Sequence, residues 1–349
     1  MDNVKIGQAI AYLRKRAGYT QKDLADRIGI SDKAVSKWER GLGLPEIGYL
    51  RKLSILLDTD TDSLLAGDVF HHDGGWIGMI VLDNNSNGIG AGTQIYDKPL
   101  INYLLSYFLL VGIKDVTIVC NAGDQIYINE KLGNGSEYGI TITVIDSLSA
   151  AVSAREWNCN IMLVYGRCLL YGVDQTRFFQ KAMMERERFT LMVLPKKMGQ
   201  CDSKVTMDLN KKVINSNSAE PLRTQYDFSS VPILFFPGKL LNEMAKCQSI
   251  ASFVSSYATE HEIYVHMLDR GFVEIEVEDW NNVQEASTFI RIVQDKCGMN
   301  VYCIEEVAWR RGFISLEQLK QLGEKYTETE YGKYIISLYR RIEENSHNY

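Results

Sequence analysis

Apolar residues recur at helical spacing through the first 66 positions, which predicts five short helices. A first apolar stripe covers residues 4–17, and the last ends near residue 66. Thr20 and Ser31 stand at the expected N-caps of the second and third helices, and Gly29 marks a tight turn between them. The pattern predicts an all-α five-helix domain over residues 1–66 that contains a helix-turn-helix.

From residue 76 the pattern changes to short apolar runs that alternate with helical stripes. The intervening residues 67–75 (GDVFHHDGG) have no periodicity, which predicts a linker. Strands are expected at 77–82, 116–120, 140–145, 161–165, 189–194 and 231–236, with a hairpin near 210–212. Helices are expected at 99–112, 174–188, 284–295, 316–323 and 331–341. This alternation predicts an α/β domain over residues 76–349 with a Rossmann-like, mainly parallel sheet.

Charge separates the two predicted domains. The whole chain of 349 residues has a net charge of −6, yet residues 1–66 hold 11 Lys and Arg against 9 Asp and Glu. The first domain is therefore +2 and the remainder is −8. Because one small domain with this charge neutralises few phosphates, DNA affinity is expected to depend on where the cations lie and on dimerisation.

Cysteine usage and hydropathy favour a soluble cytoplasmic protein. The seven cysteines are scattered and form neither a CxxC motif nor a Cys/His cluster, so neither a disulfide framework nor a zinc site is expected. The adjacent His71 and His72 have no partner at ligand spacing. The most apolar run, residues 100–113, is too short to span a bilayer and is broken by Asn102 and Ser106. No membrane partner is expected.

The third predicted helix has an outward polar face suited to DNA. Its side chains, together with those that begin the second helix and end the first, could contact phosphates or base edges. These candidates are Arg14, Thr20, Gln21, Ser31, Asp32, Lys33, Ser36, Lys37 and Arg40. The alternative is an ordinary solvated helix in a five-helix bundle.

Resemblance favours DNA binding. The segment Q-K-D-L-A-x-x-I-G-I-S-x-x-A-V-S-K-W-E-R-G-x-x-L-P, starting at residue 21, is very similar to the lambda-repressor-like (Xre) domains, and the match covers roughly residues 3–66. It implies a sequence-specific transcription regulator with double-stranded DNA as partner. A homodimer would read two half-sites.

The α/β part resembles the sugar-phosphate nucleotidyltransferases, and the glucose-1-phosphate thymidylyltransferases most closely. The matching segments are Y-D-K-P-L-I at 96–101, L-x-x-G-I-K-D-V at 109–116, L-G-N-G-S-E-Y-G-I at 132–140, R-G-F at 270–272, E-A-S-x-F-I at 285–290, C-x-E-E-V-A-W-R at 303–310 and Y-G-K-Y at 331–334. The resemblance implies the nucleotidyltransferase type of mixed sheet.

Groups that such enzymes use for catalysis are altered here. The family activates a nucleoside triphosphate with a Gly-rich loop, an Arg and Lys pair, and a magnesium ion held by two aspartates. The corresponding loop, residues 83–95, is shorter and contains no cation. Arg167 aligns with one of the two aspartates and Glu276 with the other. These departures predict a pseudoenzyme without catalytic residues, cofactor or metal, whose α/β domain is a sensor or a dimerisation module.

A remnant ligand site is the corresponding expectation. Asn84, Gly88, Gly90 and Gly92 could present backbone N–H groups to a phosphate, or form a plain flexible loop. Arg167, Glu220 and Glu276 could line a pocket for a nucleotide sugar or sugar phosphate, or pair with one another. The alternatives are an active thymidylyltransferase that carries a DNA-binding domain, and a protein-interaction platform without a ligand.

Overall fold

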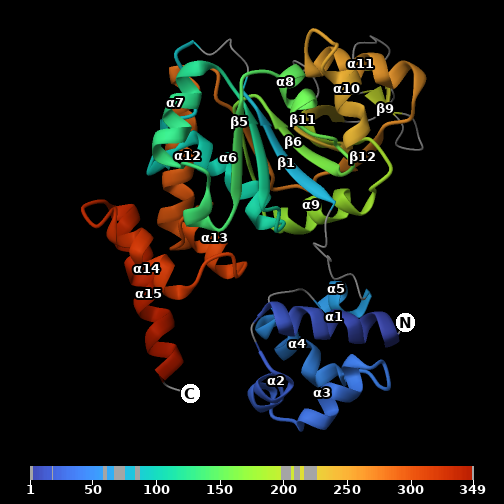
Figure 1. Cartoon of the computed structure of the whole chain (residues 1–349), viewed down its shortest axis with the longest axis vertical. Coiled ribbons are helices and arrows are strands. Elements are labelled where there is room, and N and C mark those ends of the chain that lie inside the picture. The colour runs from blue at the N-terminus through green and yellow to red at the C-terminus, as the bar shows by residue number, and fades with distance from the viewer. Residues whose placement is uncertain are drawn as a thin grey trace. The chain divides into compact units, whose positions relative to one another are not determined.

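The protein consists of two compact units, Met1–Asp73 and Gly74–Tyr349 (Figure 1). The computed structural model describes residues 3–17, 19–57, 61–66, 75–82, 87–197, 206–207, 213–215 and 226–347. The predicted hairpin at 210–212 and residues 67–74 of the predicted linker lie outside these ranges.

The first unit is the predicted bundle of five helices. They are α1 (Asn3–Arg16), α2 (Gln21–Ile28), α3 (Asp32–Glu39), α4 (Ile47–Leu56) and α5 (Thr61–Ala66). Their apolar faces meet in one core that contains Ile10, Leu24, Val35 and Leu53, all fully buried. The all-α prediction for this part of the chain is confirmed.

Local signals position the helix-turn-helix. Thr20 Oγ1 accepts a hydrogen bond from Asp23 N at 3.1 Å, and Thr20 N donates to Asp23 Oδ2 at 2.8 Å, which forms a capping box at the start of α2. Gly29 ends α2 with φ of 81°, a conformation that glycine adopts without steric cost. Ser31 Oγ accepts from Ala34 N at 3.3 Å and caps α3. The turn between α2 and α3 is therefore set by their own caps.

The second unit contains a seven-stranded mixed sheet with the order β12-β8-β11-β6-β1-β4-β5. The strands are β1 (Trp76–Val81), β4 (Asp115–Val119), β5 (Thr141–Ile145), β6 (Asn160–Tyr165), β8 (Thr190–Lys197), β11 (Tyr226–Pro237) and β12 (Tyr264–Met267). β1 runs parallel to β4 and β6, β4 to β5, and β8 to β12, whereas β11 is antiparallel to both β6 and β8. The predicted α/β mixed sheet is confirmed.

Helices and small sheets surround this sheet. The helices are α6 (Leu100–Leu110), α7 (Ala122–Lys131), α8 (Leu148–Ala154), α9 (Gln175–Met184), α10 (Leu241–Met244), α11 (Ile250–Glu260), α12 (Trp280–Cys297), α13 (Ile304–Arg310), α14 (Leu316–Glu324) and α15 (Glu330–His347), with short 3₁₀ turns at Ser136–Tyr138 and Gly238–Leu240. Three strand pairs complete the unit: β2 (Gln94–Ile95) with β3 (Lys98–Pro99), β7 (Cys168–Tyr171) with β13 (Val273–Glu276), and β9 (Thr206–Met207) with β10 (Val213–Asn215).

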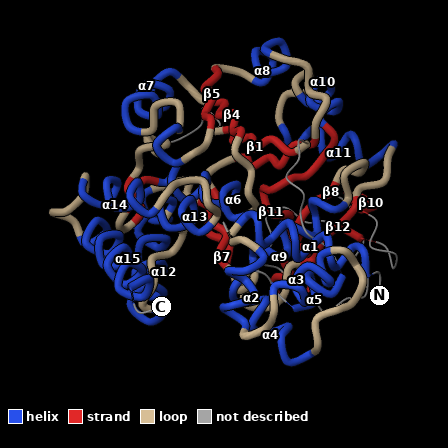
Figure 2. Tube along the Cα trace, turned by 60° about the horizontal axis from the view of Figure 1, so that its bottom comes forward, coloured by secondary structure: helices blue, strands red, loops and turns tan. Residues whose placement is uncertain are grey.

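Helices lie on either side of the strands in Figure 2. Alternate side chains of the sheet pack against these helices on its two faces. Met79, Leu163 and Phe236 join the core formed with α8, α10 and α11. On the other face Gly78 allows α6 to approach, since a Cβ at this position would lie 2.8 Å from the ring of Phe108. Both faces of the sheet are therefore covered, as the long apolar strands predict.

Candidate functional site

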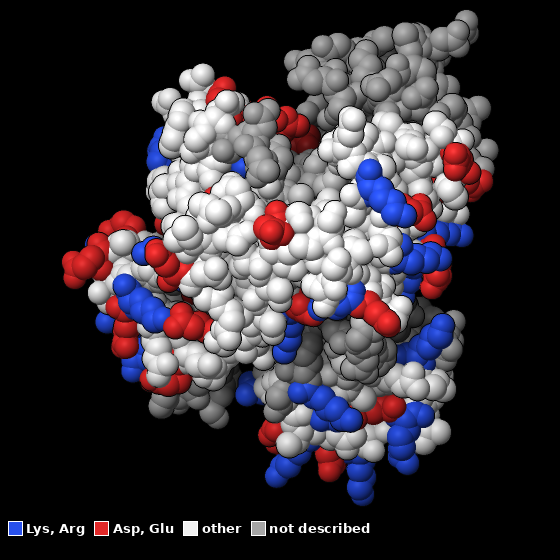
Figure 3. Space-filling model, turned by 45° about the horizontal axis from the view of Figure 1, so that its top comes forward, with Lys and Arg blue, Asp and Glu red and all other residues white. Residues whose placement is uncertain are grey.

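The exposed face of α3 carries the candidate DNA contacts. Val35 and Trp38 are buried, whereas Lys33, Lys37 and Arg40 are exposed. Figure 3 shows Lys and Arg side chains that project from the first unit, with Asp and Glu side chains among them, in keeping with its small net charge. The arrangement presents three cations to solvent from one short helix and its C-cap.

The smaller polar side chains of this face are partly engaged by their own helix. Ser31 caps α3, and Asp32 Oδ1 accepts from Lys33 N at 2.8 Å. Arg40 Nε donates to Ser36 O at 3.2 Å. Ser31 and Asp32 are exposed and Ser36 is half-buried. Their polar atoms can still meet a ligand, because each of these oxygens accepts more than one hydrogen bond.

The expectation that Arg14 points outward is wrong. Its side chain is 9% exposed and forms an ion pair with Glu39, with Nε–Oε1 at 2.5 Å and Nη2–Oε2 at 3.0 Å. Arg14 Nη1 also donates to Tyr19 O at 2.7 Å. The physical reason is helical spacing: Arg14 follows Ile10 by four residues, so it lies on the same inward face. Arg14 therefore joins α1 to α3 inside the unit.

Thr20 and Gln21 are also held by intramolecular hydrogen bonds. The Thr20 hydroxyl donates to Asp23 Oδ2 at 2.6 Å, and Gln21 Nε2 donates to Glu39 Oε2 at 2.7 Å. The side-chain oxygen of Gln21 remains available as an acceptor by its chemistry. These residues lie at the start of α2, where they support the orientation of α3 through Glu39.

In the second unit, the glycine-rich loop does not present its central N–H groups to a ligand. Gly90 N donates to Thr93 Oγ1 at 2.9 Å, and Ala91 N donates to the buried carboxylate of Asp124 at 2.6 Å. The expectation that Gly90 offers its N–H to a phosphate is therefore wrong. Gly88 is exposed with φ of 83°, in a turn, and Asn84 lies outside the described residues.

Close packing explains why positions 90 and 92 of this loop are glycines. A Cβ at Gly90 would lie 2.5 Å from Asp124 Oδ1, and one at Gly92 would lie 2.7 Å from the ring of Tyr127. Both partners belong to α7. The loop therefore needs glycine because it lies close against α7, a long-range contact that local sequence does not reveal.

Arg167 lies at the carboxyl end of the central strands. Gly166, with φ of 73°, turns the chain after β6, and its N–H donates to Val81 O at the end of β1 at 2.9 Å. Arg167 O accepts from Val277 N at 2.6 Å, which connects this turn to the end of β13. The side chain is 7% exposed. Ligands bind at this edge in open α/β sheets, so the position of Arg167 is that of a site residue.

The structure brings acidic groups to the same place. β7 and β13 pair so that Glu276 lies opposite Cys168, the residue after Arg167. The Cys168 thiol donates to Glu274 Oε1 at 3.8 Å. Burial, together with the nearby Cys168, Glu274 and Glu276, raises the pKa of the Tyr165 hydroxyl to about 12. Arg167 and Glu276 thus lie on adjacent segments of the chain's fold, Glu274 was not among the predicted residues, and Glu220 lies outside the described residues.

The resemblance to nucleotidyltransferases implies magnesium at this edge, and the residues present do not fit a protein-held ion. Magnesium requires oxygen ligands in octahedral geometry, usually including one or two carboxylates. An arginine stands where one of the two aspartates is expected, and a buried cation repels a divalent ion. Among the residues with described positions, no group of three or more His, Cys, Asp and Glu side chains could hold a metal.

A buried polar cluster that the sequence pattern did not predict joins the start of α6 to α12. Lys98, 1% exposed, forms an ion pair with Asp97 at 2.8 Å, and its ammonium lies 4.4 Å from the centre of the Tyr103 ring. The Tyr103 hydroxyl donates to Asp97 Oδ1 at 2.9 Å, and Gln294 Nε2 donates to Asp97 Oδ2 at 3.1 Å. Asp97 is therefore satisfied by three donors, two that are near it in sequence and one, Gln294, from a distant part of the chain.

A second carboxylate lies close to this cluster. Glu305 is 1% exposed and accepts hydrogen bonds from the Tyr331 hydroxyl and from the Cys303 thiol, the latter at 3.5 Å. Burial raises the pKa of Glu305 above its ordinary value. The Lys98 ammonium lies 5.2 Å from the centre of the Tyr331 ring. Several segments that resemble the nucleotidyltransferases meet here. Their residues therefore have a structural role in this buried cluster.

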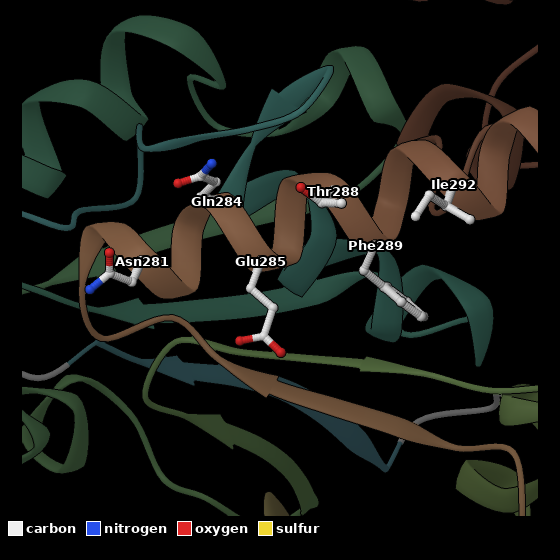
Figure 4. Close-up of a pocket in the computed structure, with 6 residues that line it drawn as sticks. All are labelled: Asn281, Gln284, Glu285, Thr288, Phe289 and Ile292. Carbon is white, nitrogen blue, oxygen red and sulfur yellow. The ribbon is translucent and has the colours of Figure 1, made fainter.

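A shallow groove of 480 Å³ runs along one side of α12. Its lining residues are Asn281, Gln284, Glu285, Thr288, Phe289 and Ile292. Figure 4 shows Glu285 and Phe289 projecting from the same side of the helix. The lining holds one carboxylate and contains none of the residues that the sequence suggests for a ligand site. This groove is therefore separate from the candidate site at Arg167.

Comparison with known families matches both units. A helix-turn-helix family model matches residues 10–64, and a nucleotidyl transferase family model matches residues 93–199. A glucose-1-phosphate thymidylyltransferase from Neisseria meningitidis is 28% identical over 262 residues, which are 71% of this chain and 91% of that protein. One of the same name from Mycobacterium tuberculosis is 26% identical over 264 residues, covering 71% of this chain and 90% of that protein.

A solved structure supports the same fold. A Bacillus anthracis protein assigned as a glucose-1-phosphate thymidylyltransferase, solved with sucrose, superposes with a TM-score of 0.52 at 12% identity. The match covers 62% of this chain and 95% of that one. No helix in the described ranges is long and apolar enough to cross a membrane.

These relatives overturn one expectation. The prediction that the chain is not an enzyme is wrong, because a nucleotidyl transferase model matches and similar proteins over most of its length are named as thymidylyltransferases. The altered groups at the loop and at Arg167 do not by themselves establish inactivity, since substrate positioning can be shared among many residues. The chain thus joins an Xre-like helix-turn-helix domain to a nucleotidyltransferase domain.

Proposed function

We propose that this fusion is a sequence-specific DNA-binding regulator whose second unit acts on a nucleoside triphosphate and a sugar 1-phosphate. The observation that carries the DNA-binding part is the exposed face of α3, where Lys33, Lys37 and Arg40 project from a helix whose other face is buried. A helix of this kind enters the major groove by its polar side.

The other candidate DNA contacts differ in their positions and in the intramolecular hydrogen bonds that they make. Ser31, Asp32 and Ser36 lie on α3 beside the cations, where short polar side chains can reach phosphates or base edges. Thr20 and Gln21 lie at the start of α2. We propose that they contact phosphate through polar atoms that are not used in the capping box of Thr20 or in the hydrogen bond from Gln21 to Glu39. Arg14 is excluded from the interface by its ion pair.

A homodimer is part of this proposal. The first unit has only a small positive charge, so a single copy would bind DNA weakly and with strong salt dependence. Two copies on half-sites about one helical turn apart would add their contacts. Sedimentation velocity of the full chain tests this point, and a monomer at every concentration that binds DNA would contradict it.

The DNA test compares two double variants of the full chain. Lys37→Ala with Arg40→Ala should weaken binding to a selected sequence, by about 1 to 3 kcal/mol for each interaction with a base edge that the variant removes. The control, Lys131→Ala with Lys296→Ala, removes the same charge from exposed positions of the second unit and should leave binding unchanged. If selection recovers no motif, or if both variants bind equally, the DNA-binding proposal fails.

The activity proposed for the second unit is thymidylyl transfer to glucose 1-phosphate. It is supported by relatives named for that reaction over 71% of this chain. In the reaction a phosphate oxygen of the sugar phosphate attacks the α-phosphorus of dTTP, the bond between the α-phosphorus and its bridging oxygen breaks, and pyrophosphate leaves. Arg167, buried at the carboxyl edge of the sheet, is the residue proposed to hold a phosphoryl group.

Turnover is measured as pyrophosphate released from dTTP and glucose 1-phosphate by the full chain. We expect equal amounts of pyrophosphate and thymidylyl sugar. Arg167→Ala should reduce the rate, whereas Arg291→Ala, which changes an exposed arginine of α12, should not. Absence of turnover together with absence of any thermal shift by either substrate would reject the proposal and favour a protein-interaction platform.

Regulation requires that ligand binding change DNA affinity. If a ligand changes operator affinity, DNA must change the affinity for that ligand by the same factor, because reciprocity links the two binding free energies. Operator affinity is therefore measured with and without dTTP and glucose 1-phosphate. Unequal affinities support a sensor, and equal affinities would limit the second unit to its own chemistry.

A further inference from the structure

We propose that Arg167 takes the place of a divalent cation held by the protein, so that the second unit binds the phosphate of a sugar 1-phosphate without magnesium. The metal part of this inference stands on the residues at the carboxyl edge of the sheet. The ligand part rests on the function proposed above for that edge. Each part has its own test.

The first step is position. The Arg167 backbone is fixed from two sides, because Gly166 N donates to Val81 O and Arg167 O accepts from Val277 N. These bonds connect the turn to β1 and to the end of β13. These bonds fix the position of the Arg167 Cα atom at the edge where the parallel strands β1 and β6 end.

The second step is charge. The register of β7 with β13 puts Glu276 opposite Cys168, next to Arg167, and Glu274 lies within 3.8 Å of the Cys168 thiol. Two carboxylates on one short strand would attract a divalent cation if nothing neutralised them. The guanidinium of the neighbouring Arg167 is always charged, so its positive charge at this edge permanently opposes the binding of a divalent cation.

The third step is ligand chemistry. A guanidinium offers a planar fork of N–H donors that matches two oxygens of a phosphate, which makes arginine suited to phosphoryl groups. Arg167 is 7% exposed, so its charge is screened less by water than a surface arginine would be. The same side chain that excludes a metal can therefore hold a phosphate directly.

The metal test uses Mn²⁺ alone and electron paramagnetic resonance of the full chain. Mn²⁺ prefers the same oxygen ligands as magnesium. We expect no tight site in the parent and at least tenfold tighter Mn²⁺ binding in Arg167→Asp, because a third carboxylate then joins Glu274 and Glu276. Arg291→Asp, the same change at an exposed position, should not gain the site.

Glu276→Gln keeps this test decisive if the Arg167 variant does not fold, since Glu276 is exposed. A parent that binds Mn²⁺ tightly and loses it in Glu276→Gln would overturn the inference. A parent whose weak Mn²⁺ binding is the same in Glu276→Gln supports it. Neither outcome depends on a nucleotide or a sugar.

The ligand test uses glucose 1-phosphate in calorimetric titrations with EDTA or with magnesium. Affinities equal within about twofold support the inference, as does a loss of at least tenfold in Arg167→Ala with no loss in Arg291→Ala. Binding that requires magnesium would overturn it. If glucose 1-phosphate binds under neither condition, the proposed function fails, and the Mn²⁺ experiment alone decides whether Arg167 replaces a metal.

Discussion

Removing the charge of Glu39 should destabilise the first unit strongly. Glu39→Gln takes the charged partner from the buried Arg14 guanidinium, which also donates to Tyr19 O, and it places an amide where two carboxylate oxygens were bound at 2.5 and 3.0 Å. Both side chains are less than a tenth exposed. Breaking a buried pair by removing one partner costs about 3–5 kcal/mol. A domain of this size has only about 3–10 kcal/mol in total.

Hydrogen exchange of the full chain, followed by mass spectrometry, measures this destabilisation. Amides of α1 and α3 that exchange by opening of the unit should exchange about 10²–10⁴ times faster, since each 1.4 kcal/mol is a factor of ten. Replacing both partners, by Arg14→Met with Glu39→Leu, should recover most of the protection because no buried charge is left alone. Gln21 Nε2 would lose its acceptor in the double variant, whereas the amide oxygen introduced by Glu39→Gln can still accept its hydrogen bond.

The matched control is Glu330→Gln in α15. Its carboxylate pairs with Lys333 at 2.7 Å, yet the two side chains are 89% and 60% exposed, so the change should have almost no effect. The reasoning is refuted if Glu39→Gln exchanges within about threefold of the parent, or if its effect equals that of the control.

Three further outcomes follow from contacts described above. Gly92→Ala should destabilise the second unit by about 1–3 kcal/mol in urea unfolding, because the new Cβ would meet the Tyr127 ring at 2.7 Å. Burial raises the pKa of Glu305, so the folded state binds its proton more tightly and the parent should lose stability as pH rises above the ordinary value of 4.5. The free energy of unfolding of Glu305→Gln, minus that of the parent, should therefore increase over this range, and a flat difference would contradict it. Hydrogen bonds from Thr20 lower the pKa of Asp23, so in Thr20→Ala an NMR titration should show that pKa raised toward its ordinary 3.8.

Local signals made the first unit predictable. Thr20 and Ser31 cap the helices at which they were placed, because an N-cap depends only on the next three residues. Arg14 was misplaced because its partner Glu39 is 25 residues away. Its spacing from Ile10 was nevertheless a usable signal for an inward position.

The second unit was less predictable where contacts are distant in sequence. The strands β7 and β13 have four residues each and pair across about a hundred residues, so neither has a clear pattern of its own. The capping box of Asp279 with Asn282 could have shown that α12 begins at Trp280. The packing roles of Gly90 and Gly92 required α7 to be in place.

The candidate sites also differ in whether they depend on local signals or on contacts that are distant in sequence. The alternation of buried and exposed residues on α3 could be read from spacing, and its contacts with DNA stay a prediction. The surroundings of Arg167 could be predicted only in part, because Glu274 comes to the adjacent Cys168 through the pairing of β7 with β13. The cluster around Asp97 was missed, since Gln294 lies 197 residues further along the chain.

The contacts of α6 with the later part of the chain have a consequence during synthesis. Asp97 accepts a hydrogen bond from Gln294, and Ser106 donates one to Tyr302 O, so the core beneath α6 cannot close until the ribosome has made that region. The first unit, whose last helix ends at Ala66, needs none of it. At about 5–20 residues per second, translation of the roughly 280 residues that follow takes tens of seconds. A nascent chain therefore carries a folded helix-turn-helix while it is still attached to the ribosome, well before its partner domain can form.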